Sequence, residues 1–359
     1  MERFRHGGDI YREPSPAGEW LDFSANINPM GLSERVRESL LQNLDRVVHY
    51  PDPEAGELKD AISKHYHLPR NEILLGNGAA ELLYLFFGVM RFDRVILPQP
   101  SFSDYERAAL AAGSHVEHVF LDPGAGFQIP WEELDALAAP SDCIALGNPN
   151  NPTGTLLSAK ELAEWIRKVG KASWVLVDES FMDFREDAAE CTVRHLVREC
   201  PRLFVLQSLT KFYALPGLRL GFGAAGEETV RRLEDSKDVW NVNLLAQKAG
   251  VAALSDTDYQ RNTLWWLWEE QAYIVEALHC IPGLKIFPPS VNFVLADVRG
   301  TGMEAAYILL EMKKRGILLR DCSNYPSLNE NYIRMAIRSH AENLRLMEAW
   351  REIMGNRGR

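Results

Sequence analysis

The middle of the chain alternates short apolar runs with longer amphipathic stretches, and this alternation limits the folds that it can adopt. Apolar runs at residues 73–75, 95–97, 144–146, 175–177, 204–206 and 220–222 predict buried strands. Stretches at 79–90, 158–171 and 227–237 predict helices between or after them. Strands that alternate with helices build a mainly parallel sheet with helices on both faces. The sequence therefore predicts an α/β fold, in which ligand sites lie beyond the carboxyl ends of the strands.

The C-terminal part of the chain has a different pattern, which predicts a second, smaller α+β domain. A tryptophan-bearing helical stretch near 260–278 is followed by strand-like segments at 290–295, 317–320 and 332–336, a helix near 302–315 and a terminal helix from 341. The first 20 residues predict an extended arm. Because 359 residues are many for one core, we expect residues 1–45 as the arm and part of the small domain, 46–255 as the large domain and 256–359 as the small C-terminal domain.

Composition narrows the possible partners. The formal net charge of −11, from 39 basic and 50 acidic residues, argues against nucleic acid as the main partner. The same field repels anions, so an anionic substrate requires a local cluster of arginines. No apolar run reaches the roughly 18 residues needed to span a membrane, and the opening residues contain no apolar signal segment. The five scattered cysteines form no Cys-x-x-Cys pair, so we expect no metal site, no disulfide framework and a cytoplasmic protein.

Lys211 lies in the segment with the most distinctive chemistry. It follows the apolar run at 203–206 and the hydroxyls of Ser208 and Thr210, and Arg219 comes shortly after it. A desolvated lysine near other cations loses its proton readily and becomes a carbonyl nucleophile. Pyridoxal 5'-phosphate offers an aldehyde for such an amine and a phosphate for its neighbours. Taken alone, the segment is more typical of a surface lysine in a loop, so its interpretation depends on two upstream segments.

Those two segments complete a pattern. Asn151 lies in Asn-Pro-Asn-Asn-Pro-Thr-Gly at 148–154, and Asp178 ends the apolar run at 174–178. A carboxylate there can pair with a pyridine nitrogen, and an amide can donate to the phenolic oxygen of the ring. In this order and spacing, the motifs around Asn151, Asp178 and Lys211 resemble those of fold-type I pyridoxal phosphate enzymes. The resemblance implies that α/β fold, with a smaller α+β domain, and pyridoxal phosphate as the cofactor.

The resemblance also implies roles at the cofactor. Lys211 and Asp178 become the catalytic residues, the first linked to the aldehyde and the second paired with the ring nitrogen. Phe102 stacks on the ring, and Tyr50 reaches the phosphate of a neighbouring subunit, which implies a homodimer. The phosphate is bound by Gly78, Ala79, Ala80, Ser208 and Arg219. Without the resemblance, residues 76–78 are an ordinary tight turn, Phe102 a core residue and Tyr50 a loop tyrosine.

Two arginines near the C-terminus are the expected substrate anchors. The resemblance assigns Arg334 to the α-carboxylate, for which a guanidinium fork is well suited. It assigns Arg320 to a substrate phosphate, together with His6, and it places Asn26 and Ile27 at the substrate. Each arginine alone could be a solvated charge at a strand end, and Arg338 lies close enough in sequence to be confused with Arg334.

Within these enzymes, two families fit the sequence. One is the histidinol-phosphate aminotransferases, and the other is the threonine-phosphate decarboxylases, which act in cobalamin biosynthesis. Segments 6–8, 21–29, 208–221, 319–326 and 333–339 resemble the decarboxylases, and so does Phe181, where typical aminotransferases have a tyrosine that donates to the ring oxygen. The expected reaction is decarboxylation of threonine phosphate to (R)-1-aminopropan-2-yl phosphate. Transamination, a phosphoserine substrate and a non-catalytic binding protein stay open, because the residues alone do not decide which bond breaks.

Overall fold

The structure is a computed structural model that describes residue 4 and residues 6–355. Its largest sheet has seven strands in the order β2-β8-β7-β6-β5-β3-β4. Four of its six strand pairings are parallel, and the two pairings of β8 are antiparallel. The mainly parallel sheet that the sequence predicts is confirmed. Its strands are β2 (Ile73–Gly76), β3 (Arg94–Gln99), β4 (His115–Phe120), β5 (Asp142–Gly147), β6 (Trp174–Asp178), β7 (Leu203–Ser208) and β8 (Gly221–Ala224).

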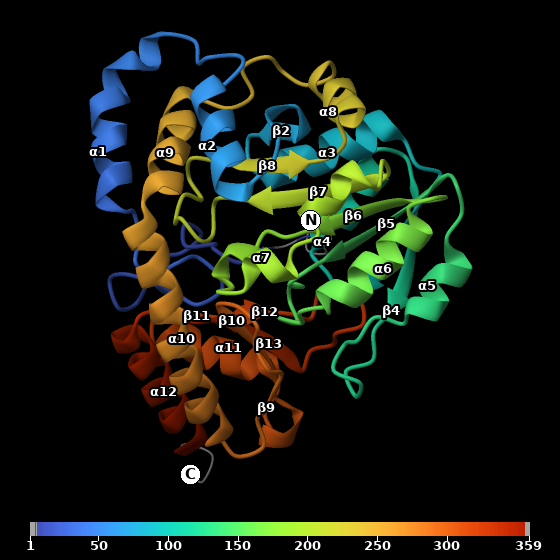
Figure 1. The fold of residues 1–359 in the computed structure, drawn as a ribbon. Helices are drawn as coiled ribbons and strands as arrows, with labels where there is room; N and C mark the ends of the chain where they lie inside the picture. Colours follow the sequence, from blue (N-terminus) through green and yellow to red (C-terminus); the bar gives the residue numbers. More distant parts are fainter. Residues whose placement is uncertain (1–3, 5, 356–359) are drawn as a thin grey trace.

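Successive residues of the central strands are buried in opposite layers of the core. On β5, Ile144 and Leu146 belong to one apolar cluster, and Cys143 and Ala145 belong to the other. The first cluster includes Ile166 of helix α6, so helices cover the sheet on both faces (Figure 1). Because side chains alternate across a strand, a strand buried on both faces reads as the continuous apolar run seen in the sequence.

The helices surround this sheet and continue into the C-terminal part. Their bounds are α1 (Glu34–Asn43), α2 (Gly56–Tyr66), α3 (Ala79–Met90), α4 (Ser103–Ala111), α5 (Trp131–Leu137), α6 (Ala159–Val169), α7 (Ala188–Cys191), α8 (Glu227–Glu234), α9 (Leu244–Ser255), α10 (Thr257–His279), α11 (Ala305–Lys314) and α12 (His340–Gly355). Short 3-10 helices are η2 (Leu44–Val48), η3 (Arg70–Glu72), η4 (Met182–Phe184), η5 (Arg194–Arg198) and η6 (Arg299–Thr301). None of the helices formed by the described residues is long and apolar enough to cross a membrane.

The C-terminal elements, orange to red in Figure 1, gather below the large sheet. They include a four-stranded sheet in the order β12-β13-β10-β9. A separate pair, β1 and β11, joins the N-terminal segment to this part through parallel pairing of Leu21 with Ile317. The strands are β1 (Leu21–Asp22), β9 (Lys285–Ile286), β10 (Phe293–Asp297), β11 (Ile317–Leu318), β12 (Arg320–Asp321) and β13 (Tyr332–Ala336).

Two details differ from the sequence prediction. The single strand expected at 317–320 is divided into β11 and β12, because Leu319 passes the chain from one sheet to the other. The edge strand β4 was not predicted, since its pattern mixes exposed and half-buried residues rather than forming an apolar run. Neither difference affects the carboxyl edge of the large sheet. There Asp178 ends β6, while Phe102, Asn151 and Lys211 follow β3, β5 and β7 respectively.

Candidate active site

A cavity of about 580 Å³ lies at this carboxyl edge. Its walls come from the N-terminal arm, the loops after the strands of the large sheet, and β12 and β13. Most of the residues that the sequence analysis selected line it: His6, Asn26, Ile27, Ala79, Ala80, Phe102, Asn151, Asp178, Ser208, Lys211, Arg219, Arg320 and Arg334. Among the residues that the structure describes, no cluster of His, Cys, Asp or Glu side chains could hold a metal ion.

The side-chain amine of Lys211 has a lowered pKa. Its Nζ donates to Thr210 Oγ1 at 2.7 Å, and Thr210 Oγ1 lies 2.7 Å from Ser208 Oγ. Burial, reinforced by the positive charge of Arg219, lowers the pKa of Lys211 to about 8, while Asp178 opposes this shift. A substantial fraction of the amine is therefore neutral near physiological pH, which is the form that attacks an aldehyde.

Asp178 is a buried carboxylate held by two neutral donors. Its side chain accepts from the Ser180 backbone N–H at 2.9 Å and from the Tyr105 hydroxyl at 2.7 Å. Burial raises the pKa of Asp178, and hydrogen bonds from Ser180 and Tyr105, together with the charge of Lys211, act in the opposite direction. The carboxylate thus faces the cavity without a cationic hydrogen-bond partner among the described residues, and a protonated pyridine nitrogen would supply the missing charge.

Tyr105 is a site residue to which the sequence analysis gave no role. It comes three residues after Phe102, and the two rings meet edge-on at 5.6 Å. Residues three apart lie on the same face of a helical turn. That spacing could have identified Tyr105 once a role was given to Phe102, because α4 begins at Ser103.

The start of α3 forms an anion cradle. No side chain caps this helix, so the first N–H groups, including those of Ala79 and Ala80, are available to a ligand. Gly78 has a φ of 80°, and a Cβ at Gly78 would lie 2.3 Å from Arg219 Nη2. Only glycine lets the guanidinium of Arg219 approach this turn so closely. Together with Ser208, these groups fit the phosphate of the expected cofactor.

Arg320 and Arg334 stand side by side in the cavity. They are directly opposite each other in the antiparallel pair β12–β13, and each is only 5% exposed. Arg334 donates to Asn151 Oδ1 and to the Ser24 carbonyl oxygen, the latter at 2.7 Å. Its Nε is buried and has no hydrogen-bond partner among the described residues, and burial lowers the pKa of Arg334. A buried cation with neutral partners and an unused donor is suited to receive an anion.

The structure also distinguishes Arg334 from Arg338 as candidates for binding the carboxylate. Arg338 lies beyond the end of β13 and donates to Glu342 Oε1 at 2.7 and 2.9 Å. Its charge is therefore already paired, and it does not line the cavity. Arg320 lines the cavity and donates to Asn324 Oδ1 at 2.8 Å. Arg334 is the arginine that the geometry favours for the carboxylate.

The N-terminal arm closes one side of the cavity. His6 Nε2 lies 3.2 Å from Asp104 Oδ1, and the ring of His6 contacts that of Phe102 at 5.5 Å. The Gly8 N–H donates to Ser24 Oγ at 2.8 Å. Since the Ser24 carbonyl accepts from Arg334, the arm and Arg334 meet at Ser24, to which the sequence analysis gave no role. The Asn26 side-chain oxygen is buried, and no residue in the described part of the chain forms a hydrogen bond with it.

Two expected cofactor residues do not line the cavity. Gly78 lies behind it, against Arg219. Tyr50 is 76% exposed and stacks on Trp240 with ring centroids 4.3 Å apart. Its position outside the cavity of its own chain agrees with the predicted role toward a neighbouring subunit and does not test that role.

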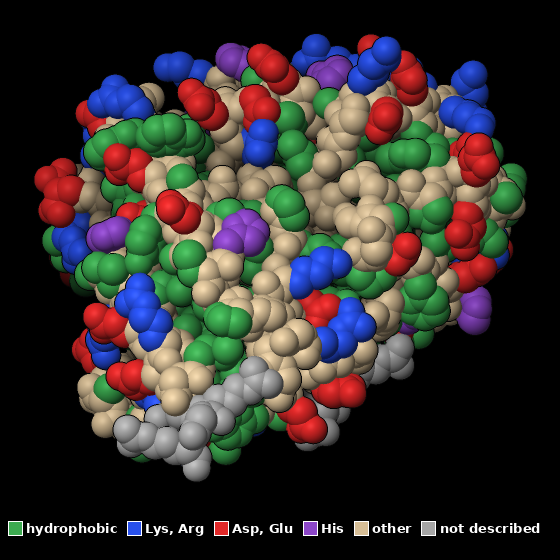
Figure 2. Space-filling model, turned by 90° about the horizontal axis from the view of Figure 1, so that it is seen from below, with side chains coloured by type: hydrophobic (Ala, Val, Ile, Leu, Met, Phe, Trp, Pro, Cys, Tyr) green, Lys and Arg blue, Asp and Glu red, His purple; other side chains and the backbone are tan. Residues whose placement is uncertain are grey.

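The residues present fit pyridoxal phosphate. The cavity offers an amine with a lowered pKa, an opposed buried carboxylate and an uncapped helix start beside an arginine. On the outer face in Figure 2, acidic and basic side chains are interspersed. The cavity is lined by four basic side chains, Lys211, Arg219, Arg320 and Arg334, and by three acidic ones, Asp22, Asp104 and Asp178, in a chain whose net charge is −11.

Comparison with known proteins identifies the family. Residues 18–349 match the family described as aminotransferase class I and II. The threonine-phosphate decarboxylase of Salmonella typhimurium strain LT2 is 36% identical over 356 residues, which cover 97% of this chain and 96% of that protein. The structure of L-threonine-O-3-phosphate decarboxylase from Porphyromonas gingivalis has a TM-score of 0.81 at 26% identity, covering 93% of this chain and 99% of that one. Histidinol-phosphate aminotransferase from Clostridium acetobutylicum has a TM-score of 0.87 at 27% identity, with the same coverage of 93% and 99%. The chain therefore belongs to the aminotransferase class I and II family and, within it, to the threonine-phosphate decarboxylase family.

Proposed function

We propose that this chain is a pyridoxal phosphate-dependent carboxy-lyase. It converts L-threonine O-3-phosphate to (R)-1-aminopropan-2-yl phosphate and carbon dioxide, for the nucleotide loop of cobalamin. The family supports this reaction, and so does the chemistry of the cavity. The site roles below are part of the same proposal.

The juxtaposition of Arg320 and Arg334 is the observation that carries the proposal. Like charges directly opposite each other in a sheet repel, and burial increases the cost. A substrate that brings a carboxylate and a phosphate on neighbouring carbon atoms supplies one anionic group to each guanidinium. Histidinol phosphate carries a phosphate but no carboxylate, so by itself it supplies an anionic group to only one of them. An aminotransferase would still use Arg334 for its oxo-acid co-substrate, so the identity of the product decides between the two reactions.

Each side chain of the site has a separate proposed role in the reaction. Bound pyridoxal phosphate supplies the chemistry of an electron sink for the bond that breaks. Asp178 would pair with the protonated ring nitrogen, and Phe102 would pack against the ring face. Arg334 holds the carboxylate and Arg320 the phosphate, and together they orient the substrate. Lys211, with a pKa of about 8, is placed to return a proton to Cα after carbon dioxide leaves.

Phe181 supports decarboxylation over transamination. Its ring lines the cavity and packs edge-on against Phe293 at 5.1 Å. A phenyl ring donates no hydrogen bond, so Asn151 alone remains as the expected donor to the ring oxygen. Typical aminotransferases of the resembling group have a tyrosine at this position. The arginine pair does not distinguish phosphothreonine from phosphoserine, because one methyl group contributes only about 1–3 kcal/mol in a pocket.

We also propose a homodimer. Exposed apolar residues of α1, η2, the loop after η2 and the segment before α9 supply the surface: Leu41, Leu44, Val47, Val48, Tyr50, Val239 and Trp240. Exposed apolar surface of this kind is typical of protein interfaces. Formation of the dimer would bring Tyr50 to the cofactor phosphate of the partner.

Two further expectations remain proposals. One is the division of the chain into an N-terminal segment (1–45), a large domain (46–255) and a small domain (256–359). The pairing of β1 with β11, which joins the N-terminal segment to the small domain, agrees with it. The other is a cytoplasmic location, which agrees with the free thiols of all five cysteines.

The product assay tests the reaction. Purified protein with pyridoxal phosphate is incubated with phosphothreonine, phosphoserine or histidinol phosphate, with and without 2-oxoglutarate. We expect carbon dioxide and the amino alcohol phosphate from phosphothreonine, independent of 2-oxoglutarate. Formation of glutamate from histidinol phosphate, without release of carbon dioxide from phosphothreonine, would establish the aminotransferase alternative.

Arginine variants in the same assay separate the two anionic ends of the substrate. Arg320→Ala should lower kcat/KM for phosphothreonine far more than for threonine, whereas Arg334→Ala should lower both. Removing one partner of a desolvated charge pair costs about 2–5 kcal/mol, which is roughly 30- to 5000-fold in kcat/KM. Equal losses for both substrates in Arg320→Ala would remove Arg320 from the phosphate site.

The pKa of Lys211 predicts the pH dependence of cofactor capture. The neutral amine attacks the aldehyde, so the rate at which protein stripped of cofactor takes up pyridoxal phosphate should rise with pH. Its midpoint should lie at about 8. Arg219→Gln should move the midpoint upward, since it removes a positive charge that disfavours the ammonium form. Stopped-flow absorbance measures the rate, and a midpoint near 10.5, the ordinary value for lysine, would contradict the assignment.

Measurement of the molecular mass in solution tests the proposed dimer. Val48 is 79% exposed on the proposed interface, and Val48→Asp should weaken association, because it places a charge in an apolar contact. Leu310→Asp, at a leucine of α11 that is 52% exposed, is the control. Light scattering after gel filtration should give a dimer for the native chain and the control. A native chain that remains monomeric at micromolar concentration would exclude the proposed dimer.

A further inference from the structure

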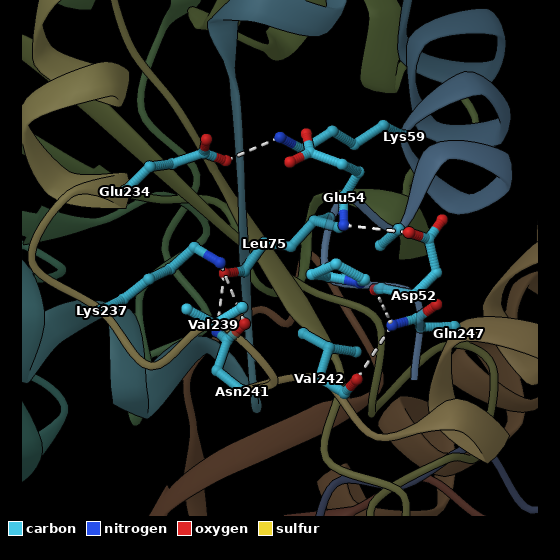
Figure 3. A pocket seen from close by; sticks show the side chains of 12 residues that line it. Asp52, Glu54, Lys59, Leu75, Glu234, Lys237, Val239, Asn241, Val242 and Gln247 are labelled. Atoms are coloured by element: carbon cyan, nitrogen blue, oxygen red, sulfur yellow. Dashed lines mark hydrogen bonds and ion pairs between the residues drawn. The ribbon is translucent and has the colours of Figure 1, made fainter. Parts of the chain in front are cut away.

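A second polar network lies behind the phosphate cradle, in a part of the molecule to which the reaction assigns no role. It borders a small cavity of about 10 Å³ between α2, α8 and the segment that precedes α9 (Figure 3). We infer that Asn241 is a positioning residue, which holds the turn between β2 and α3 in the form that binds the cofactor phosphate. This inference rests on the proposed function, because it concerns the same phosphate.

The Asn241 amide uses both of its groups. Its Nδ2 donates to the Leu75 carbonyl oxygen at 3.0 Å and to Glu81 Oε2 at 2.8 Å. Its Oδ1 accepts from Lys237 Nζ at 3.1 Å. Figure 3 shows Lys237 and the Leu75 carbonyl directed toward Asn241. Since donors and acceptor are all engaged, the orientation of the amide is fixed.

Glu81 connects Asn241 to the turn. It is the third residue of α3, and its Oε2 accepts from the Asn77 backbone N–H at 2.6 Å. A carboxylate in the first turn of a helix is the natural partner of the free N–H groups at the helix start. Here those of Ala79 and Ala80 are the groups that the phosphate needs. By holding Glu81 on Asn77, Asn241 prevents the carboxylate from competing for them.

The charges around Glu81 support the same role for Asn241. A carboxylate close to a phosphate site opposes binding of a dianion, and Lys237 offsets it through Asn241. Burial lowers the pKa of Lys237, and Glu81 is among the acidic groups that counteract this shift. On its other side the turn is confined by Arg219 at Gly78 and by β8, where a Cβ on Gly221 would lie 2.7 Å from the Ala79 nitrogen. The turn is therefore constrained on both sides, and Asn241 supplies the constraint away from the cofactor.

The test compares two ligands that differ only in the phosphate. Equilibrium dissociation constants for pyridoxal phosphate and for pyridoxal are measured by absorbance on protein stripped of cofactor. Asn241→Leu should weaken pyridoxal phosphate about tenfold, the effect of one hydrogen bond to a charged group, and leave pyridoxal unchanged. Asn241→Asp keeps the shape of the side chain but repels Glu81, and it should act in the same direction.

Gln247→Leu is the matched control. Gln247 is an amide in the same small cavity, and it donates to the carbonyl oxygens of Asp52 and Val242 at 2.9 and 3.0 Å. These contacts do not involve Glu81 or the turn, so this variant should bind pyridoxal phosphate like the native chain.

Three results would overturn the inference: unchanged affinity in both Asn241 variants, an equal loss for the two ligands, or a similar loss in Gln247→Leu. If the native chain bound no pyridoxal phosphate, the proposed function would fail instead, so the two failures are distinguishable.

Discussion

The burial of two opposite charges, those of Lys211 and Asp178, in one cavity is the constraint on which the rest of the site depends. Lys211 and Asp178 face the same cavity, and each changes the pKa of the other toward the charged form. Burial acts against both charges and is the larger effect at each. The result is an amine that can lose its proton near pH 8 and a carboxylate that has no cationic hydrogen-bond partner among the described residues. Both properties suit a ligand that carries an aldehyde and a basic ring nitrogen.

The fold produces this arrangement by collecting residues from distant parts of the chain. Parallel strands put Asp178, Asn151 and Lys211 at one edge of the sheet. The antiparallel pair β12–β13 places Arg320 opposite Arg334, and Arg334 reaches back to Asn151. Asn151 thereby connects the proposed cofactor site to the proposed substrate site. A change at Arg334 should therefore affect the ring as well as the substrate.

The sequence predicts the residues that directly follow strands better than those that support them. Asp178 and Lys211 can be predicted because each lies at or just after the end of an apolar run, and because their motifs follow one another in the order typical of the family. Tyr105 and Asn241 are not, since their importance comes from contacts with Asp178 and Glu81, which lie far away in the chain. Ser24 acts through its backbone carbonyl, which no side-chain pattern reveals. The division of β11 and β12 was missed for a related reason, because a continuous apolar run does not indicate where a chain passes between sheets.

The identity of the modified lysine tests the account most directly. The protein is loaded with pyridoxal phosphate, reduced with borohydride and digested, and the peptides are analysed by mass spectrometry. We expect the added phosphopyridoxyl mass on Lys211, and we expect Lys237, whose pKa is also lowered by burial, to be unmodified. Modification of another lysine with Lys211 intact, or no stable modification at all, would contradict the assignment on which the cofactor, the reaction and the role of Asn241 depend.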